Sequence, residues 1–362
     1  MAIYGGCRTT AMGIMPHTDI ERALELALGL DIPFWPQLPN VSFYEDMYVQ
    51  SSQNFPGITV DIENKRIMFD NAGFEAGLDD YSQAISEPET FTLSREYSSV
   101  YHRFLAQNLE GYQAIRGQIT GPVSFGFKVV DEGLKPIIYN EDVRGILFDF
   151  IRRKINIQYR ELSQKNRNAF VWVDEPGLGW VFSSLSGYSD VRARDDYLDF
   201  IRGIESPSAL HLCANVNLPF LLGLGIDILS FDAYQIENMP GEYARAIARF
   251  LDNGGILCWG IVPTDSSSLG RETPESLCAL ITSYWESVSK HSGLAPQRIA
   301  EQALLAPARC CLKNVGQVGA AGEIPRRGEE DCQVSSIEEQ LVEKAFSYLQ
   351  EMSEMLRRKY GL

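Results

Sequence analysis

Short apolar segments with strand character alternate with longer helical segments along most of this 362-residue sequence. Runs such as AFVWV and DILSF are rich in β-branched and aromatic residues, which favour strands. This alternation is typical of parallel strands joined by crossover helices, and eight such strands close a barrel. We therefore predict an α/β fold in which residues 1–362 form a single (β/α)8 TIM barrel. The expected strands lie near residues 8–14, 32–36, 116–120, 169–174, 208–213, 227–232, 255–262 and 303–309.

Two segments break this rhythm. Residues 55–75, FPGITVDIENKRIMFDNAGFE, have the pattern of a β-hairpin excursion whose turn lies around Asn64. Residues 314–334, NVGQVGAAGEIPRRGEEDCQV, are rich in glycine and charge and follow the last expected strand. This loop is interpreted as a mobile surface segment or, alternatively, as a lid over the active face.

Two helices carry the pattern of a capping box, in which a hydroxyl residue precedes a glutamate by three positions. Thr18 with Glu21 stands ahead of the run ERALELAL, and Ser336 with Glu339 stands ahead of the last expected helix, roughly residues 337–359. Each pair predicts a helix start.

Composition and net charge limit the kinds of molecule that the protein is expected to bind. The sequence is 45% hydrophobic and 22% charged, with a formal net charge of −16 that no cluster of Lys and Arg offsets. Nucleic acids and anionic membranes are polyanions, so neither is an expected partner. The sequence has no apolar run near the ~20 residues of a spanning helix, and the start MAIYGGCRTT lacks the pattern of a secretory signal. We expect a cytoplasmic protein.

The seven cysteines are an odd number in a long chain without an export signal, so we expect reduced thiols rather than a disulfide framework. His211 and Cys213 are two positions apart on one expected strand, which places both side chains on the same face. Asp232 ends the next strand, and Cys310 ends the last. An imidazole, two thiolates and a carboxylate are a typical zinc set. The alternative is that the cysteines are small buried apolar groups and the histidine an ordinary polar residue.

The run VWVDEPGLGW presents a second feature. An apolar strand continues into Asp174 and Glu175, and Pro176 then ends it because proline has no N–H to donate. Adjacent strand residues point to opposite sides, so at most one of the two carboxylates faces the interior. They serve either as helix caps and solvated loop groups, or Asp174 receives the ammonium group of a substrate.

Several of these segments resemble the C-terminal catalytic half of cobalamin-independent methionine synthase, in the superfamily of uroporphyrinogen decarboxylase. TTAMGIMPHTD is similar to that family's opening strand and loop, TGPVS over Thr120–Ser124 to its T-G-P-V-T segment, and VDEPGL to its D-E-P-A-L motif. The likeness extends over most of the chain. It implies a barrel-shaped methyltransferase that moves a methyl group to the thiol of homocysteine and so makes methionine.

The resemblance also implies a zinc ion held through H-x-C, a downstream glutamate and the cysteine of C-G-L-K. HLC supplies His211 and Cys213, and CCLK supplies Cys310. Asp232 stands where the family has its glutamate, one methylene shorter. Cys311 is expected to face away, because successive strand residues alternate.

Substrate-binding roles pass to this chain by the same likeness. Asp174 is implied as the catalytic residue that binds the amino acid substrate, supported by Glu45 or Asp46 in FYEDM. Gly13 and Ile14 occupy the place of the family's Gly-Ser, so backbone amides around Gly13 are expected to hold the substrate carboxylate.

Departures from the family change the expected methyl donor. The chain has no room for the additional barrel that helps to bind methyl folate, and Thr264 and Asp265 stand where the family has a catalytic histidine. Methylcobalamin, as a corrinoid often carried on a protein, is therefore the expected donor. Two alternatives stay open: a corrinoid-dependent methyltransferase for another small thiol such as coenzyme M, and a non-catalytic zinc-containing barrel.

Overall fold

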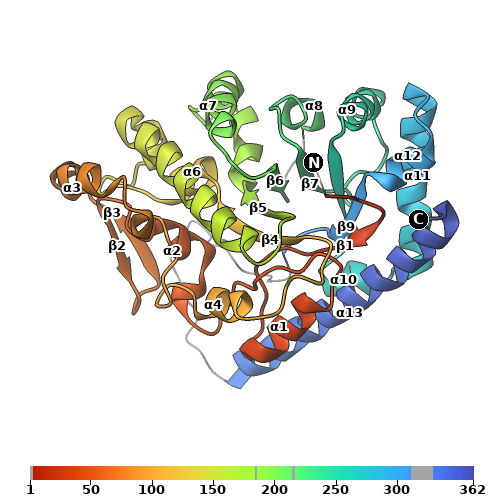
Figure 1. The fold of residues 1–362 in the computed structure, drawn as a ribbon, viewed down its shortest axis with the longest axis horizontal. Coiled ribbons are helices and arrows are strands. Elements are labelled where there is room, and N and C mark those ends of the chain that lie inside the picture. The colour runs from red at the N-terminus through yellow and green to blue at the C-terminus, as the bar shows by residue number, and fades with distance from the viewer. Residues whose placement is uncertain (1–2, 184–185, 214–216, 311–328) are drawn as a thin grey trace.

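The computed structural model describes residues 3–183, 186–213, 217–310 and 329–362. Within these ranges a curled parallel sheet occupies the centre, with the strand order β1-β9-β8-β7-β6-β5-β4. Figure 1 shows helices surrounding this sheet. The strands of this sheet are β1 (Arg8–Thr9), β4 (Ile115–Thr120), β5 (Ala169–Asp174), β6 (Ser208–Leu212), β7 (Ile228–Asp232), β8 (Ile256–Val262) and β9 (Ala303–Pro307).

The helices lie mostly between successive strands. In chain order the α-helices are α1 (Ile20–Leu28), α2 (Met47–Ser52), α3 (Asn71–Ala84), α4 (Ser99–Leu105), α5 (Pro122–Lys128), α6 (Glu141–Ser163), α7 (Asp190–Arg202), α8 (Leu218–Leu221), α9 (Gly241–Asp252), α10 (Ser266–Leu269), α11 (Pro274–Ser292), α12 (Pro296–Glu301) and α13 (Glu329–Tyr360). Short 3-10 helices are η1 (Phe43–Glu45), η2 (Pro88–Thr90), η3 (Ile137–Tyr139) and η4 (Pro176–Phe182). Among the described residues, no helix has both the length and the apolar character needed to cross a bilayer.

Local sequence accounts for these elements. Every residue of β5 is buried, as expected for a strand covered on both faces, and its β-branched and aromatic side chains suit that position. Helix α9 buries Ala244, Ile247, Ala248 and Leu251, which follow the i, i+3, i+4, i+7 spacing of one helix face. The predicted α/β architecture is therefore confirmed as a curled parallel sheet with crossover helices.

The second expected strand, near residues 32–36, is not a regular strand. Pro33 and Pro36 have no N–H groups, so a continuous ladder cannot form there. Isolated hydrogen bonds replace it: Ile32 donates to the Thr9 carbonyl at 3.0 Å, and Arg116 donates to the Pro33 carbonyl at 3.0 Å. The first expected strand is also short, since the regular part of 8–14 covers Arg8–Thr9 alone.

The hairpin excursion is confirmed. Strand β2 (Ile58–Asp61) pairs antiparallel with β3 (Arg66–Phe69), and the Asn64 backbone and side chain both donate to Asp61 in the turn. The excursion ends before residue 75, because α3 begins at Asn71. Asp70 accepts from the backbone of Gly73 and so provides the cap that starts this helix.

Helix starts differ from the predicted capping boxes. The N-cap of α1 is Asp19, whose carboxylate accepts from the backbones of Glu21 and Arg22. Thr18 instead donates from its backbone to Glu339 of α13 at 3.0 Å. The two predicted boxes thus contact each other, and an ion pair between Arg22 and Glu343 joins α1 to α13 nearby (Figure 1).

Helix α13 begins at Glu329, so the loop predicted over residues 314–334 ends earlier than expected. Residues 314–328 of that loop, and Cys311, lie outside the described residues.

Candidate metal and substrate site

Alternate residues of the strands form a small inner cluster on the concave side of the sheet. Its members are Ile3, Met12, Ile32, Ala114, Phe170, Trp172, Ala209, Ile228, Ile256, Cys258, Leu304 and Ala306. Because strand residues alternate, Asp174, His211 and Asp232 share the face of this cluster, at the carboxyl ends of β5, β6 and β7. Cys310 packs against the same cluster from beyond β9. The predicted residues therefore gather at one end of the sheet.

His211 is held in one orientation and leaves one ring nitrogen for a ligand. Its ring stacks on Trp172, with 5.7 Å between ring centroids, and Nδ1 lies 3.0 Å from the Ser230 hydroxyl. The Nε2 atom is buried and has no hydrogen-bond partner among the described residues. Burial, assisted by the positive charge of Arg116, lowers the pKa of His211 to about 3, so the ring is neutral. With the proton on Nδ1, Nε2 presents a lone pair.

Cys213 lies within electrostatic range of Cys310, Asp174 and Asp232. Burial raises the pKa of the Cys213 thiol, and these three acidic neighbours raise it further. A negative charge on any of these neighbours therefore disfavours the ionisation of the Cys213 thiol. A bound divalent cation reverses this relationship.

Asp232 has a partner of a different kind. Its Oδ2 accepts from Arg309 Nε at 2.7 Å, and its Oδ1 accepts from the backbone of Gln235 at 3.2 Å. Burial raises the pKa of Asp232, and the Arg309 hydrogen bond opposes that rise. The structure therefore places the carboxylate of Asp232 in an ion pair.

Within the described ranges, no three or more His, Cys, Asp and Glu side chains are gathered closely enough to hold a metal ion. His211, Cys213, Asp232 and Cys310 therefore stay predicted ligands. The donor chemistry of three of them fits zinc: a neutral buried imidazole with an unpartnered nitrogen, the Cys310 thiol beside the inner cluster, and the Cys213 thiol within electrostatic range of Cys310.

The two carboxylates of the DEP run have separate roles. Glu175 is fully buried and accepts from the Val123 backbone at 2.9 Å, the Ser124 backbone at 2.7 Å and the Tyr197 hydroxyl. It thereby satisfies the N-terminal amides of α5, as a capping side chain does. Asp174 faces the opposite side. Burial raises the pKa of Asp174 to about 7, against the lowering effect of Arg116.

Arg116 is a residue that the sequence analysis missed. It is fully buried, and its guanidinium lies between the rings of Phe34 and Trp172, with the carbon 4.8 Å and 3.9 Å from the two centroids. It donates to Thr10 and Gln118 at 3.1 Å and 3.0 Å. A charged residue inside the apolar run AIRGQIT is a signal that could have found it, since buried arginine needs partners.

Glu45 and Asp46 are both engaged in local capping. Glu45 is buried and accepts from the Ser98 hydroxyl at 2.7 Å and the Val100 backbone at 3.2 Å, at the start of α4. Asp46 is the N-cap of α2 and accepts from the backbone of Tyr48 at 2.8 Å. Substrate binding by either residue stays a prediction.

Gly13 and Ile14 lie against the segment that follows residue 32. Ile14 forms a parallel bridge with Gln37, and the Gly13 carbonyl accepts from the Gln37 backbone at 2.7 Å. A Cβ at Gly13 would lie 2.6 Å from the Gln118 side chain and 2.9 Å from Gln37 Oε1. A larger residue there would displace the ends of these two glutamine side chains.

Thr264 and Asp265 follow β8, where the resembling family has its catalytic histidine. Asp265 is the N-cap of α10 and accepts from the Ser268 backbone at 2.8 Å. Thr264 donates to the Cys310 carbonyl at 3.4 Å.

Comparison with known proteins adds little to this geometry. No protein-family model and no curated protein matches the chain. One similar solved structure is a B12-independent methionine synthase from Shewanella sp. W3-18-1 in complex with selenomethionine. It is 14% identical, has a TM-score of 0.43, and the match covers 68% of this chain and 63% of that chain. A TM-score this low assigns no function.

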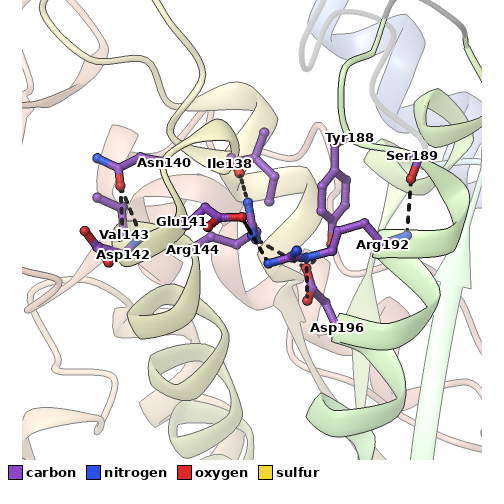
Figure 2. A network of polar contacts seen from close by, with 10 residues as sticks. All are labelled: Ile138, Asn140, Glu141, Asp142, Val143, Arg144, Tyr188, Ser189, Arg192 and Asp196. Carbon is purple, nitrogen blue, oxygen red and sulfur yellow. Dashed lines mark hydrogen bonds and ion pairs between the residues drawn. The ribbon is translucent and has the colours of Figure 1, made fainter.

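A network of charged and polar residues connects α6 with α7 and the segment before it (Figure 2). Arg144 at the start of α6 forms ion pairs with Glu141 and with Asp196 of α7, both at 3.2 Å. Tyr188, in the connection after β5, donates to Asp196 at 2.8 Å, and the Arg144 guanidinium carbon lies 5.7 Å from its ring. Helices α6 and α7 and the connection that follows Asp174 are thereby joined.

Proposed function

We propose that this protein is a zinc-dependent methyltransferase that makes methionine from homocysteine, with a methylated corrinoid as donor. The observation that carries the proposal is the environment of the His211 ring. Its Nε2 is buried, without a described partner and oriented through Ser230, at the same end of the sheet as Cys213 and Cys310. Orientation of a metal-binding histidine by a hydrogen bond to its other nitrogen is a common property of metal sites.

We also propose that the sheet closes into a (β/α)8 barrel, with residues 32–37 in the place of the second strand. The isolated bonds from Ile32 to Thr9 and from Arg116 to Pro33 support this, since they link this segment to both β1 and β4. Ile32 further belongs to the inner cluster. In a closed barrel the carboxyl ends of all strands face one site.

The zinc ligands in this proposal are His211, Cys213 and Cys310. Asp232 stays with Arg309, which leaves three protein ligands and an open position, as in catalytic zinc sites. A zinc ion bound there would supply a Lewis acid that keeps an acceptor thiol deprotonated at neutral pH. The neutral state of His211 suits this role, because a protonated imidazole cannot bind a metal.

The remaining residues bind the acceptor. The Asp174 carboxylate accepts hydrogen bonds from the ammonium group of homocysteine, and Arg116 favours the charged form of that carboxylate. Backbone amides around Gly13 hold the substrate carboxylate. The acceptor thiol would lose its proton to solvent, and its sulfur would take the methyl group that a methylated corrinoid would supply when bound, with the bonding pair staying on the donor. Asp174 is the residue that distinguishes homocysteine from a thiol without an ammonium group.

The test combines metal analysis with turnover. Purified protein supplemented with zinc should contain one zinc per chain and should form methionine from homocysteine and methylcobalamin. Cys213→Ala and His211→Ala should lose both zinc and turnover. Cys278→Ala is a matched control, because Cys278 is a buried thiol on α11, in a different core cluster, and is not a proposed ligand.

Three results would contradict the proposal. If Cys213→Ala still bound one zinc per chain, Cys213 would not be a zinc ligand. Methionine formation from methyl folate alone would overturn the corrinoid donor. Equal turnover of homocysteine and coenzyme M would show that Asp174 does not select the acceptor.

A further inference from the structure

A stack of flat side chains leads to one of the proposed zinc ligands. The Arg116 guanidinium carbon is 4.8 Å from the ring centroid of Phe34 and 3.9 Å from that of Trp172. Trp172 in turn stacks on His211, with 5.7 Å between the ring centroids and 18° between the ring planes. All four side chains are buried. A continuous series of contacts therefore connects a charged group to His211.

The strand order explains how these side chains meet. Arg116 lies on β4, Trp172 on β5 and His211 on β6, and these three strands are neighbours in the sheet. Trp172 and Asp174 share one face of β5, because strand residues alternate. The indole of Trp172 thus contacts one side chain from each neighbouring strand, the guanidinium on one strand and the imidazole on the other.

Arg116 is held firmly in this stack. Its Nε donates to the Thr10 hydroxyl at 3.1 Å, and its Nη1 donates to the Gln118 side chain at 3.0 Å and to the Gly117 carbonyl at 3.3 Å. These acceptors are all neutral oxygens, although a buried cation is usually paired with a carboxylate. Burial lowers the pKa of Arg116 to about 9, so the group is still charged at neutral pH. A buried cation bonded in this way is unfavourable for stability, and a role in holding its neighbours accounts for its place better.

The His211 ring needs two constraints before its Nε2 points in one direction. The 3.0 Å contact between Nδ1 and the Ser230 hydroxyl fixes one edge of the ring, but the ring can still turn about that contact. Nearly parallel stacking on Trp172 limits this rotation. Because Arg116 lies against Trp172, it limits the movement of the indole in the same way.

We propose that Arg116 is a positioning residue, which acts through Trp172 to fix the plane of the His211 ring and so the direction of Nε2. A planar guanidinium suits this task because it stacks on aromatic faces, whereas a lysine ammonium is a point charge on a flexible chain. A ring that is already oriented loses less freedom when it binds a metal, so the stack raises the zinc affinity. This consequence for zinc rests on the proposed function, whereas the orientation of the ring does not.

The test observes the His211 ring in metal-free protein that contains isotope-labelled histidine, at neutral pH. In wild type, the two ring nitrogens of His211, assigned by their loss in His211→Gln, should give the separate magnetic resonance signals of a proton fixed on Nδ1. In Arg116→Met the two signals should approach each other, because a ring that can turn exchanges between its two tautomers. Arg144→Met is the matched control and should leave the signals unchanged. It also removes a buried guanidinium that lies against an aromatic ring, 5.7 Å from the centroid of Tyr188.

Two further variants separate the planar group from its charge and from the stability of the fold. Arg116→Lys keeps a cation near Trp172 but has no planar group, so its signals should resemble those of Arg116→Met. Thr10→Val removes the acceptor of Nε without altering either ring and should shift the signals in the same direction by a smaller amount. This variant keeps the test valid if Arg116→Met does not fold. Wild-type signals in Arg116→Met or in Arg116→Lys would overturn the proposal.

Zinc affinity is the second readout. Competition with a chelator should show binding weakened by about 10-fold in Arg116→Met and unchanged in Arg144→Met. If wild type binds no zinc but the His211 signals change as expected, the proposed zinc site is wrong and the positioning role is confirmed. If wild type and Arg116→Met bind zinc equally and their His211 signals agree, the positioning role is wrong and the zinc site stands.

Discussion

The carboxylate of Asp232 is held by Arg309, with 2.7 Å between Oδ2 and Nε, and the two side chains differ sharply in exposure, 2% against 57%. A buried carboxylate already paired with a cation is poorly available to a metal. We therefore expect Asp232→Asn to retain one zinc per chain, whereas His211→Ala loses it. Metal content of dialysed protein is the measurement. Equal zinc loss in both variants would make Asp232 a ligand and remove the three-ligand proposal.

Ser230 is expected to act on zinc affinity through His211. Its hydroxyl lies 3.0 Å from His211 Nδ1, and loss of such a supporting hydrogen bond typically weakens metal binding by about 10- to 100-fold. Competition with a chelator should show this loss for Ser230→Ala. Ser208→Ala is the matched control, since Ser208 lies at the other end of β6 and donates to Asp227 at 2.8 Å. Unchanged affinity in Ser230→Ala would exclude this orienting role.

Substitution of Glu175 should lower the stability of the fold, whereas substitution of Asp174 should weaken substrate binding. Glu175→Ala leaves the buried donors of Val123, Ser124 and Tyr197 without an acceptor, which should lower the free energy of unfolding by at least about 3 kcal/mol. Asp174→Asn should leave stability nearly unchanged and raise the KM for homocysteine about 10- to 100-fold, because a charged hydrogen bond to the ammonium group is lost.

Urea denaturation and initial-rate kinetics on both variants provide the measurements. Reduced stability in Asp174→Asn with an unchanged KM would show that Asp174 is a structural residue. An unaltered unfolding midpoint in Glu175→Ala would show that Glu175 does not stabilise the start of α5.

Lys154 should make stability depend on pH. Burial lowers the pKa of Lys154 from 10.5 to about 7. Between these values the unfolded chain binds a proton that the folded chain does not, so the free energy of unfolding rises with pH, by at most about 1.4 kcal/mol per pH unit. Glu161, on the same helix, is the other ionisable side chain that lines the same small cavity between α6 and β4 as Lys154.

The difference in unfolding free energy between wild type and Lys154→Met, measured by urea denaturation at several pH values from 6 to 10, isolates this contribution. Wild type should gain relative to the variant as pH rises through this interval. Lys128→Met, on the surface of α5, is the control and should follow wild type. A constant difference between wild type and Lys154→Met would show that Lys154 keeps its ordinary proton affinity in the fold.

The local pattern of apolar and β-branched residues was sufficient to predict much of the architecture. The expected strand at 169–174 coincides with β5, and the strand expected at 208–213 differs from β6 by one residue. These segments are long and buried on both faces, so their composition alone indicates a strand. The segment 32–36 failed because its prolines interrupt the ladder, although its neighbours are those of a strand.

Residue identity was not sufficient where a side chain has a distant partner. Glu45, a predicted substrate ligand, accepts from Val100, 55 positions away. Asp232, a predicted metal ligand, pairs with Arg309, 77 positions away. Both roles stay predictions, but the sequence did not indicate either partner. A carboxylate has the same chemistry in each setting, and only the folded chain determines which donor reaches it.

The sequence by itself determined the parallel α/β architecture and the opposite directions of Asp174 and Glu175, and it predicted that His211 and Cys213 share a face. All of these follow from the two-residue period of a strand, which is a property of the local backbone. Tertiary structure alone decided which polar groups are already satisfied: Glu175 by the start of α5, Asp232 by Arg309, and His211 at one nitrogen only. Those pairings depend on distances between segments that local sequence does not specify.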